Sequence, residues 1–241
     1  MQATDRQVRD AATYLAKDLA KFCEKLLGPD FIGFYLIGSL AHGGFNRRYS
    51  DIDVALISEN GIDDTERDAF DRQAKRLSPD LAYRVSLFWS DRKFSMGRFP
   101  PLDRLDYIDR AVALAEREKI AIDRPGLDEI RLYLRGAPFE QWATRGTNFA
   151  TQSALDPDDR KTYLKTHLYP ARFAYSWLTG EIASNDDAIA YLRDHPPADL
   201  DLALLSRALQ CRHDAADPDK LFADRHSLPK QYAACGQLMT G

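Results

Sequence analysis

The stretch over residues 37–56 reads IGSLAHGGFNRRYSDIDVAL, and it decides how the whole chain is interpreted. The apolar run just before it, residues 31–37, and the run at its end, residues 51–57, both have the pattern of buried strands. The residues between them are polar and rich in glycine, which is typical of a loop. Asp51 and Asp53 lie two apart in the second strand, so both carboxylates project from one face.

This acidic pair and the turn that precedes it suit the same ligand. Two carboxylates that close repel each other, and a divalent cation is the usual partner of such a pair. Gly38 lets the backbone approach an anion closely, and Ser39 offers an N–H and a hydroxyl to phosphate. A phosphate-binding turn beside two carboxylates is typical of Mg²⁺-nucleotide chemistry, because the ions hold the attacking and leaving oxygens of an in-line displacement.

Helical and strand patterns continue on both sides of this stretch. Apolar residues recur at spacings of three and four over residues 5–27, which predicts a helix that Gly28 and Pro29 end. A second helix is expected over residues 63–77 and a third strand over residues 81–89. The order of these elements indicates a small mixed α/β domain.

The rest of the chain has a mostly helical pattern. Residues 103–114 are helical in period, and Pro170 is expected to kink or split an aromatic helix over residues 158–178. Further helices are predicted over residues 185–194, 199–213 and 228–239. We therefore expect an α+β protein, with a small mixed-sheet domain over residues 1–105 and a helical domain over residues 106–241.

Composition and charge limit the partners and the compartment. The 241 residues include 33 Lys and Arg against 37 Asp and Glu, and the net charge of −4 argues against a long nucleic acid as partner. The N-terminus lacks the apolar core of a signal peptide, and no apolar run approaches the roughly 20 residues that cross a bilayer. Cys23, Cys211 and Cys235 lie far apart, so buried thiols are expected instead of a disulfide framework or a zinc site. We expect a cytoplasmic protein with no membrane partner.

Gly38-Ser39, followed by a loop and by Ser-Asp-Ile-Asp-Val over residues 50–54, resembles the signature of polymerase β-type nucleotidyltransferases. The resemblance covers roughly residues 30–90. It implies a nucleotidyltransferase domain with two Mg²⁺ ions, held by Asp51 and Asp53, and ATP as the substrate.

Further candidates for nucleotide contacts lie in the same loop. Gly38 and Ser39 are joined by Ser50 and Arg48 as candidate contacts for the phosphates. Arg47 and Arg48 could equally be solvated loop charges. His42 could contact phosphate or lie exposed in the loop.

The run over residues 171–188 is similar to the helical C-terminal domain of streptomycin/spectinomycin adenylyltransferases, which carry a comparable Ala-Arg…Thr-Gly-x-Ile…Asp-x-Ala run. This resemblance implies a domain that supplies basic side chains to the triphosphate and acidic ones to a polyol or amine acceptor. Arg193 and Arg207 are candidates for the phosphates, and Asp186 is a candidate for the acceptor. The alternative for each is an ordinary surface charge on a helix.

One position departs from the family pattern. The family places a third carboxylate on the next strand, often as the base that deprotonates the attacking hydroxyl, and the matching position here is Arg84. The nearest acid downstream is Asp91, which strict alternation places on the other face from residue 84 unless a bulge intervenes. Asp91 is therefore the remaining candidate for the third catalytic carboxylate.

These features together predict an enzyme that moves a nucleoside monophosphate to a hydroxyl of a small molecule such as an aminoglycoside. The favoured nucleotide is AMP, donated by ATP. One alternative is an antitoxin-type nucleotidyltransferase that modifies protein or tRNA. The other is a nucleotide-binding protein without transfer activity, and the identity of residue 84 separates it from the first two.

Overall fold

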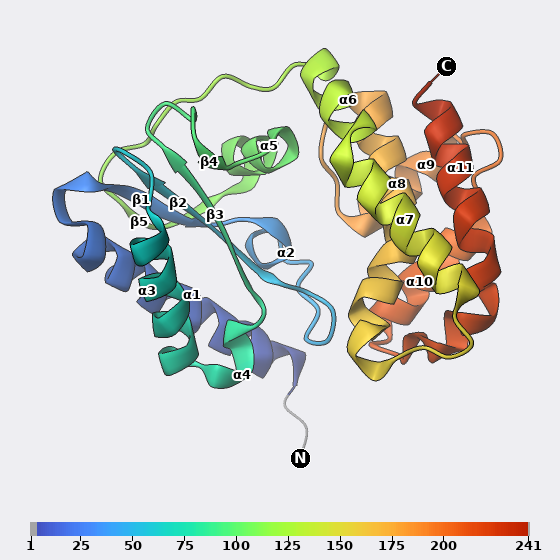
Figure 1. Ribbon diagram of the computed structural model, residues 1–241, viewed down its shortest axis with the longest axis horizontal. Coiled ribbons are helices and arrows are strands. Elements are labelled where there is room, and N and C mark those ends of the chain that lie inside the picture. The colour runs from blue at the N-terminus through green and yellow to red at the C-terminus, as the bar shows by residue number, and fades with distance from the viewer. Residues whose placement is uncertain (1–3, 241) are drawn as a thin grey trace. The chain divides into compact units, whose positions relative to one another are not determined.

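The computed structural model describes residues 4–240 of the chain (Figure 1). The chain divides into two compact units, Met1–Arg124 and Pro125–Gly241. A five-stranded mixed sheet lies in the first unit, and the described part of the second unit is helical, so the α+β class is confirmed. The expected boundary after residue 105 falls within helix α5 (Pro101–Arg110), and the first unit continues beyond it.

The sheet has the strand order β4-β3-β2-β1-β5. Its strands are β1 (Phe31–Leu36), β2 (Ile52–Ser58), β3 (Val85–Asp91), β4 (Gly97–Arg98) and β5 (Val112–Glu116). β2 and β3 are parallel, whereas the other neighbouring pairs are antiparallel. The strands expected over residues 31–37 and 51–57 are confirmed.

Two sequence predictions about strands need correction. The third strand begins at Val85 and not at residue 81, because Pro79 starts a short helix, α4 (Pro79–Ala82), in front of it. The helix expected over residues 103–114 ends at Arg110, and the chain continues into β5 at the edge of the sheet. The apolar residues that were assigned to the end of a helix therefore pair with β1 instead.

The helices of the first unit begin and end where local signals require. Its helices, besides α4 and α5, are α1 (Asp5–Leu27), α2 (Gly38–Ala41) and α3 (Asp64–Leu77), with a 3₁₀ turn over Gly28–Asp30. A capping box between Thr4 and Gln7 starts α1, and Gly28, at a φ of 52°, ends it. A second capping box, between Asp63 and Glu66, starts α3.

The sheet has a core on each face. On one face, Ile52 and Val54 of β2 pack in a cluster with buried residues of α1 and α3. On the other face, Ala55 and Ile57 pack with Tyr107 of α5. Side chains alternate along a strand, so Asp53 projects to the same face as Ala55. The acidic pair and α5 therefore belong to the same side of the sheet.

The second unit is built around one central helix. Its helices are α6 (Leu127–Arg135), α7 (Ala137–Thr151), α8 (Arg160–Thr179), α9 (Asn185–Asp194), α10 (Leu202–His213) and α11 (Leu228–Leu238), with 3₁₀ segments over Pro157–Asp159 and Pro218–Ser227. α8 packs against each of the other five helices. The helices α6 and α7 had no counterpart in the sequence predictions, and the helix expected from residue 199 begins at Leu202.

Pro170 does not split α8, which was one of the two outcomes predicted from the sequence. Proline has no N–H, so the carbonyl of Thr166, one turn earlier, loses its usual helical donor. The hydroxyl of Tyr232, on α11, donates to that carbonyl at 2.9 Å. A tertiary contact thus satisfies the group that the proline leaves without a partner, and the helix continues.

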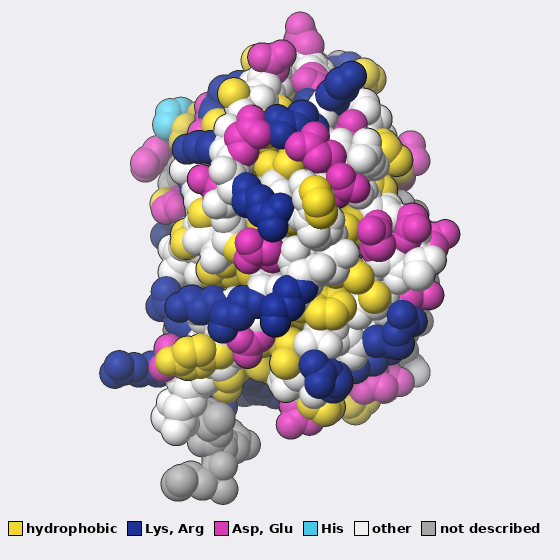
Figure 2. All heavy atoms as spheres, turned by 90° about the vertical axis from the view of Figure 1, so that its left-hand side faces the viewer, with side chains coloured by type: hydrophobic (Ala, Val, Ile, Leu, Met, Phe, Trp, Pro, Cys, Tyr) yellow, Lys and Arg dark blue, Asp and Glu magenta, His cyan; other side chains and the backbone are white. Residues whose placement is uncertain are grey.

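Three further properties bear on partners. Among residues 4–240, no helix is long and apolar enough to span a membrane. Cys23, Cys211 and Cys235 are buried free thiols, as expected. On the face drawn in Figure 2, basic and acidic side chains are interspersed, and neither sign covers the face.

Candidate active site

The structure brings Gly38 and Asp53 into contact at the end of β1. The backbone N–H of Ile37 donates to the carbonyl of Asp53 at 3.1 Å, which fixes the two segments side by side. Gly38 has a φ of 66°, and a Cβ on it would overlap the carboxylate of Asp53. Only glycine suits this position, since both its backbone conformation and its close approach to Asp53 exclude a side chain. Asp51 immediately precedes β2, and Asp53 lies within it.

The loop that leads into the pair is held by its own side chains. The Oδ1 atom of Asn46 accepts hydrogen bonds from the N–H groups of Arg48, at 2.9 Å, and Tyr49, at 3.1 Å. The hydroxyl of Ser50 accepts from the N–H of Asn46 at 2.9 Å, and Ser50 is only 3% exposed. This buried hydroxyl therefore orders the loop.

Arg84 also holds this loop, through hydrogen bonds to its backbone carbonyls. Its Nη2 and Nε atoms donate to the carbonyl of Ser50 at 2.6 and 3.1 Å, and its Nη1 donates to the carbonyl of Arg47 at 2.7 Å. The residue is 5% exposed, and its own carbonyl accepts from the N–H of Ile52 at 2.8 Å. Arg84 is thus an anchor for the segment in front of Asp51.

Asp91 lies far from the acidic pair. β2 and β3 pair one residue for one residue, with Asp53 opposite Ser86 and Ser58 opposite Asp91, and no bulge interrupts the register. At about 3.3 Å per residue, this places Asp91 roughly 16 Å further along the strands. Asp91 could act as the third carboxylate only if a bulge in the strand brought it to the site. The described pairing of β2 and β3 contains no such bulge.

The Asp91 carboxylate also has other partners. It accepts from the N–H and hydroxyl of Ser95, both at 2.7 Å, and from the N–H of Met96 at 3.0 Å. Burial raises the pKa of this carboxyl group, but the hydrogen bonds from Ser95, Met96 and Lys93 outweigh burial and lower the pKa below its usual value. Asp91 therefore stabilises the turn after β3.

A carboxylate that the sequence analysis missed lies at the site instead. Asp106, on α5, is 8% exposed; its Oδ2 accepts from the N–H of Gly38 at 2.6 Å, and its Oδ1 lies 2.7 Å from Nε2 of His42. α5 brings it there from 68 positions along the chain. Asp106 is one of several acidic residues on a helical pattern, so no local signal distinguished it from the others.

Comparisons with known proteins agree with this geometry. Residues 16–104 match the family model described as nucleotidyltransferase domain. The matched residues lie within the first unit. They include the turn at Gly38, the acidic pair and part of α5.

No curated protein matches the chain by sequence. Among solved structures, the chain is similar to the spectinomycin adenyltransferase AAD(9) from Enterococcus faecialis, whose crystal structure was determined with ATP and spectinomycin. The identity is 13%, the match covers 95% of this chain and 99% of that chain, and the TM-score is 0.64. The resemblance to this branch of nucleotidyltransferases, expected from the sequence, is thereby confirmed for the fold.

The remaining candidate residues have local partners. In the nucleotidyltransferase domain, the guanidinium of Arg48 lies over the ring of Tyr49, 5.7 Å from its centre. In the second unit, the candidates pair as follows: Arg193 with the Ser206 hydroxyl at 3.0 Å, Arg207 with Asp224 at 3.1 Å, and Asp186 with His213 at 2.6 Å. These contacts are largely exposed, so they leave the three side chains accessible to water.

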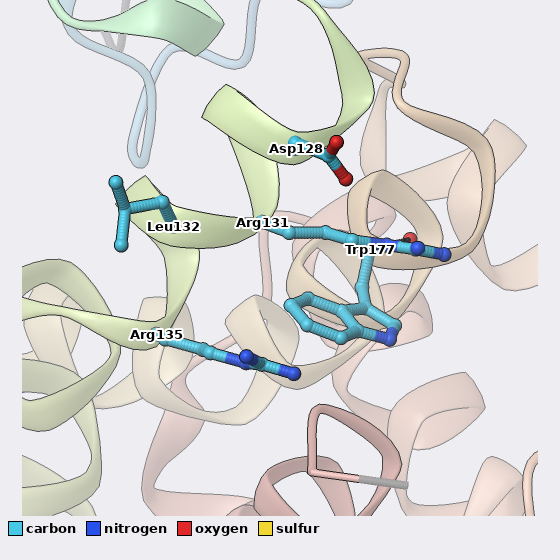
Figure 3. Close-up of a pocket in the computed structure, with 5 residues that line it drawn as sticks. All are labelled: Asp128, Arg131, Leu132, Arg135 and Trp177. Carbon is cyan, nitrogen blue, oxygen red and sulfur yellow. Dashed lines mark hydrogen bonds between the residues drawn. The ribbon is translucent and has the colours of Figure 1, made fainter.

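A separate pocket of about 470 Å³ lies within the second unit (Figure 3). Arg131 and Arg135, one turn apart on α6, reach the indole of Trp177 on α8, with guanidinium-to-ring distances of 4.9 and 4.7 Å. Asp128 and Leu132 complete the lining. The Nε atom of Arg131 also donates to the carbonyl of Trp177 at 3.2 Å. Such cation–π contacts tie α6 to α8.

Proposed function

We propose that the protein transfers a nucleoside monophosphate, AMP from ATP, to a hydroxyl group of a small molecule of the aminoglycoside class. The observation that carries this proposal is the contact between Gly38 and the Asp53 carboxylate, with Asp51 next to it, inside the matched domain. The similarity to a structure that holds ATP and spectinomycin supports the choice of nucleotide and acceptor class. Because ATP is the proposed substrate, we also propose that the protein works in the cytoplasm.

Asp51 and Asp53 are the residues that would hold Mg²⁺. Among the described residues, no group of three or more His, Cys, Asp or Glu side chains could hold a metal by itself. This fits Mg²⁺ in a transferase, since Mg²⁺ is usually bound by one or two carboxylates together with substrate phosphates. A bound ion would neutralise charge on the phosphates. Gly38 and Ser39 then keep the phosphates beside the carboxylates.

The transfer step balances without a further reagent. The acceptor oxygen forms a bond to the α-phosphorus, while the bond from that phosphorus to the bridging oxygen breaks and pyrophosphate leaves with the electron pair. The hydroxyl proton passes to solvent, since the sequence resemblance assigns Arg84, which cannot accept a proton, to the position of the family's base. General-base assistance typically contributes about 10²–10⁴ in rate. We therefore expect a slow enzyme that depends on positioning and charge neutralisation.

The second unit supplies the remaining proposed contacts. Arg193 and Arg207 are proposed to approach the triphosphate, and Asp186 is proposed to approach an amine or hydroxyl of the acceptor. Each of these side chains is held by a partner on a neighbouring element, as Asp186 is by His213. Such support restricts the side chain without removing its charge.

The decisive experiment uses the full chain with Mg²⁺, each labelled nucleoside triphosphate and a panel of aminoglycosides. The expected product is an acceptor heavier by one nucleoside monophosphate, detected by mass spectrometry. Labelling of a protein or of tRNA in the same assay would favour the antitoxin-type alternative. Nucleotide binding without any product would favour the binding protein, and absence of nucleotide binding would refute all three.

A further inference from the structure

The Asp106 carboxylate joins the two ends of the turn that begins at Gly38. One oxygen accepts from the Gly38 N–H at 2.6 Å, and the other lies 2.7 Å from Nε2 of His42. The backbone N–H of His42 also donates to the carbonyl of Gly38 at 3.3 Å. His42 is therefore held at a fixed place beside Gly38 by both its backbone and its ring.

Asp106 and Asp53 both lie against Gly38. Both Asp106 oxygens have partners, and the residue is 8% exposed. What Asp106 can do is hold and orient the imidazole, as carboxylates do for histidines in many enzyme sites.

The imidazole of His42 keeps one nitrogen for a ligand. Its side chain is 21% exposed, and among the described residues Nδ1 has no hydrogen-bond partner. A protonated imidazole donates from both nitrogens, so one N–H can bind Asp106 while the other binds an anion.

We propose that His42, oriented by Asp106, binds the β- and γ-phosphates of the nucleotide as a cation. This inference rests on the proposed function, since it concerns the same site. The phosphates that the turn holds become the leaving pyrophosphate, so a cation here stabilises the charge that develops as the bond breaks. In this role His42 is a catalytic residue and Asp106 is a positioning residue.

The geometry also allows the opposite role for Asp106. Its carboxylate occupies the N–H of Gly38 as an anion would, so it could block the turn until a nucleotide displaces it. The two roles predict opposite signs. Removing the Asp106 charge weakens nucleotide binding if the residue orients His42, and strengthens it if the residue is a plug.

The test measures the dissociation constants of Mg²⁺-ATP and Mg²⁺-pyrophosphate by titration calorimetry for the wild type, His42→Gln, Asp106→Asn and a control, His195→Gln. Glutamine can still donate to Asp106 but carries no charge, and His195 is a histidine of the second unit whose ring contacts the carbonyl of Tyr191. We expect His42→Gln to weaken both ligands about 10-fold to 100-fold, as loss of a charge-assisted hydrogen bond does. Asp106→Asn should weaken both ligands by less than His42→Gln does, because the imidazole remains but loses its orienting carboxylate, and the control should match the wild type.

Other outcomes separate the possible failures. If the wild type binds both ligands and His42→Gln binds them equally well, the inference is wrong and the proposed function stands. Tighter binding by Asp106→Asn would assign the plug. If the wild type binds neither ligand, the proposed function fails as well. Far-UV circular dichroism of each variant checks folding, and His42→Arg, which keeps a cation, should recover part of the affinity if His42→Gln is unfolded.

Discussion

The two ends of the β2–β3 pair use their carboxylates in different ways. At the start of the pair, Asp53 lies against Gly38 and is followed along the strand by apolar residues of the core. At the other end, Asp91 is surrounded by the donors of Ser95 and Met96. The strands between the two ends are in unbroken register. The Asp91 carboxylate accepts from local N–H and O–H groups and stabilises a turn. The Asp53 carboxylate lies against a glycine that a side chain could not replace.

The same comparison concerns the residue just before β3. Arg84 uses its guanidinium on the carbonyls of Arg47 and Ser50. The acid nearest to Gly38 on that side comes from α5, as Asp106. A carboxylate thus reaches the site from a helix that covers the sheet, whereas Arg84 binds the carbonyls of the loop.

The largest effect is expected from the acidic pair. The double variant Asp51→Asn/Asp53→Asn should weaken Mg²⁺-dependent ATP binding at least about 100-fold, because both anionic ligands of the ion are lost. Its folding stability should be unchanged or slightly higher, since repulsion between the carboxylates is relieved. A thermal shift series with Mg²⁺-ATP measures both effects. Equal ligand stabilisation of the wild type and the double variant would remove the pair from the site.

The next effect concerns the turn. Gly38→Val should abolish measurable ATP binding and destabilise the first unit, because the φ of 66° disfavours a β-branched residue and the new Cβ overlaps the Asp53 carboxylate. Gly43→Val is a matched control: its φ of 84° imposes the same strain, but nothing lies within 4 Å of its Cβ. We expect Gly43→Val to lose stability yet bind ATP. Comparable ATP binding by both variants would mean that contact with Asp53 is irrelevant to the ligand.

Arg84 is expected to have an intermediate effect, through stability. Arg84→Met leaves the carbonyls of Ser50 and Arg47 without their charged donor, which should lower the free energy of unfolding by about 2–4 kcal/mol. ATP affinity should fall several-fold because the loop in front of Asp51 loses its anchor. Urea unfolding and calorimetry measure the two effects, with the exposed Arg76→Met as control.

Arg84→Glu sharpens the same point. If the only consequence of arginine at position 84 were the lack of a general base, glutamate at this position would raise the transfer rate. The buried contacts with two carbonyls predict a destabilised and less active variant instead. A gain of activity would contradict the anchoring role.

Much of this arrangement could be predicted from the sequence, because it depends on local patterns. The two apolar strands, the glycine turn and the acid spacing lie within residues 31–57, and each has a short-range signature. The features that were missed depend on contacts between distant segments. Asp106 reaches Gly38 only after α5 covers the sheet, and β5 is a strand because β1 needs a partner at its edge.

In the second unit, α8 also depends on a contact between distant segments. Pro170 in the middle of an apolar helical pattern normally indicates a break. The hydroxyl of Tyr232 compensates for it, and no local rule on residues 158–178 could reveal that donor. Sequence reasoning therefore succeeded where a residue's neighbours along the chain decide its conformation, and failed where a partner from another element does.

The smallest effect is expected at the other end of the strands, where Asp91→Asn tests the comparison directly. ATP affinity and transfer rate should equal those of the wild type, because Asp91 is about five residues along the strands from the Asp53 level. The free energy of unfolding at neutral pH should fall by about 1 kcal/mol, since an asparagine oxygen still accepts from Ser95 but without the charge. Calorimetry and urea unfolding of the same preparations measure these quantities, and a large loss of transfer with normal stability would return Asp91 to the active site.

The difference in unfolding free energy between the wild type and Asp91→Asn should depend on pH, because it depends on the charge of the Asp91 carboxylate. The pKa of Asp91 is lowered in the folded protein, so its stabilising contribution is fully present above the unfolded value of about 4. As the pH falls through the folded pKa, the carboxylate becomes protonated and the contribution disappears. The unfolding free energies of wild type and Asp91→Asn should therefore differ at pH 7 and converge progressively as the pH falls below about 4. A difference that persists at low pH would show that packing, and not the charge on the carboxylate, holds the turn after β3.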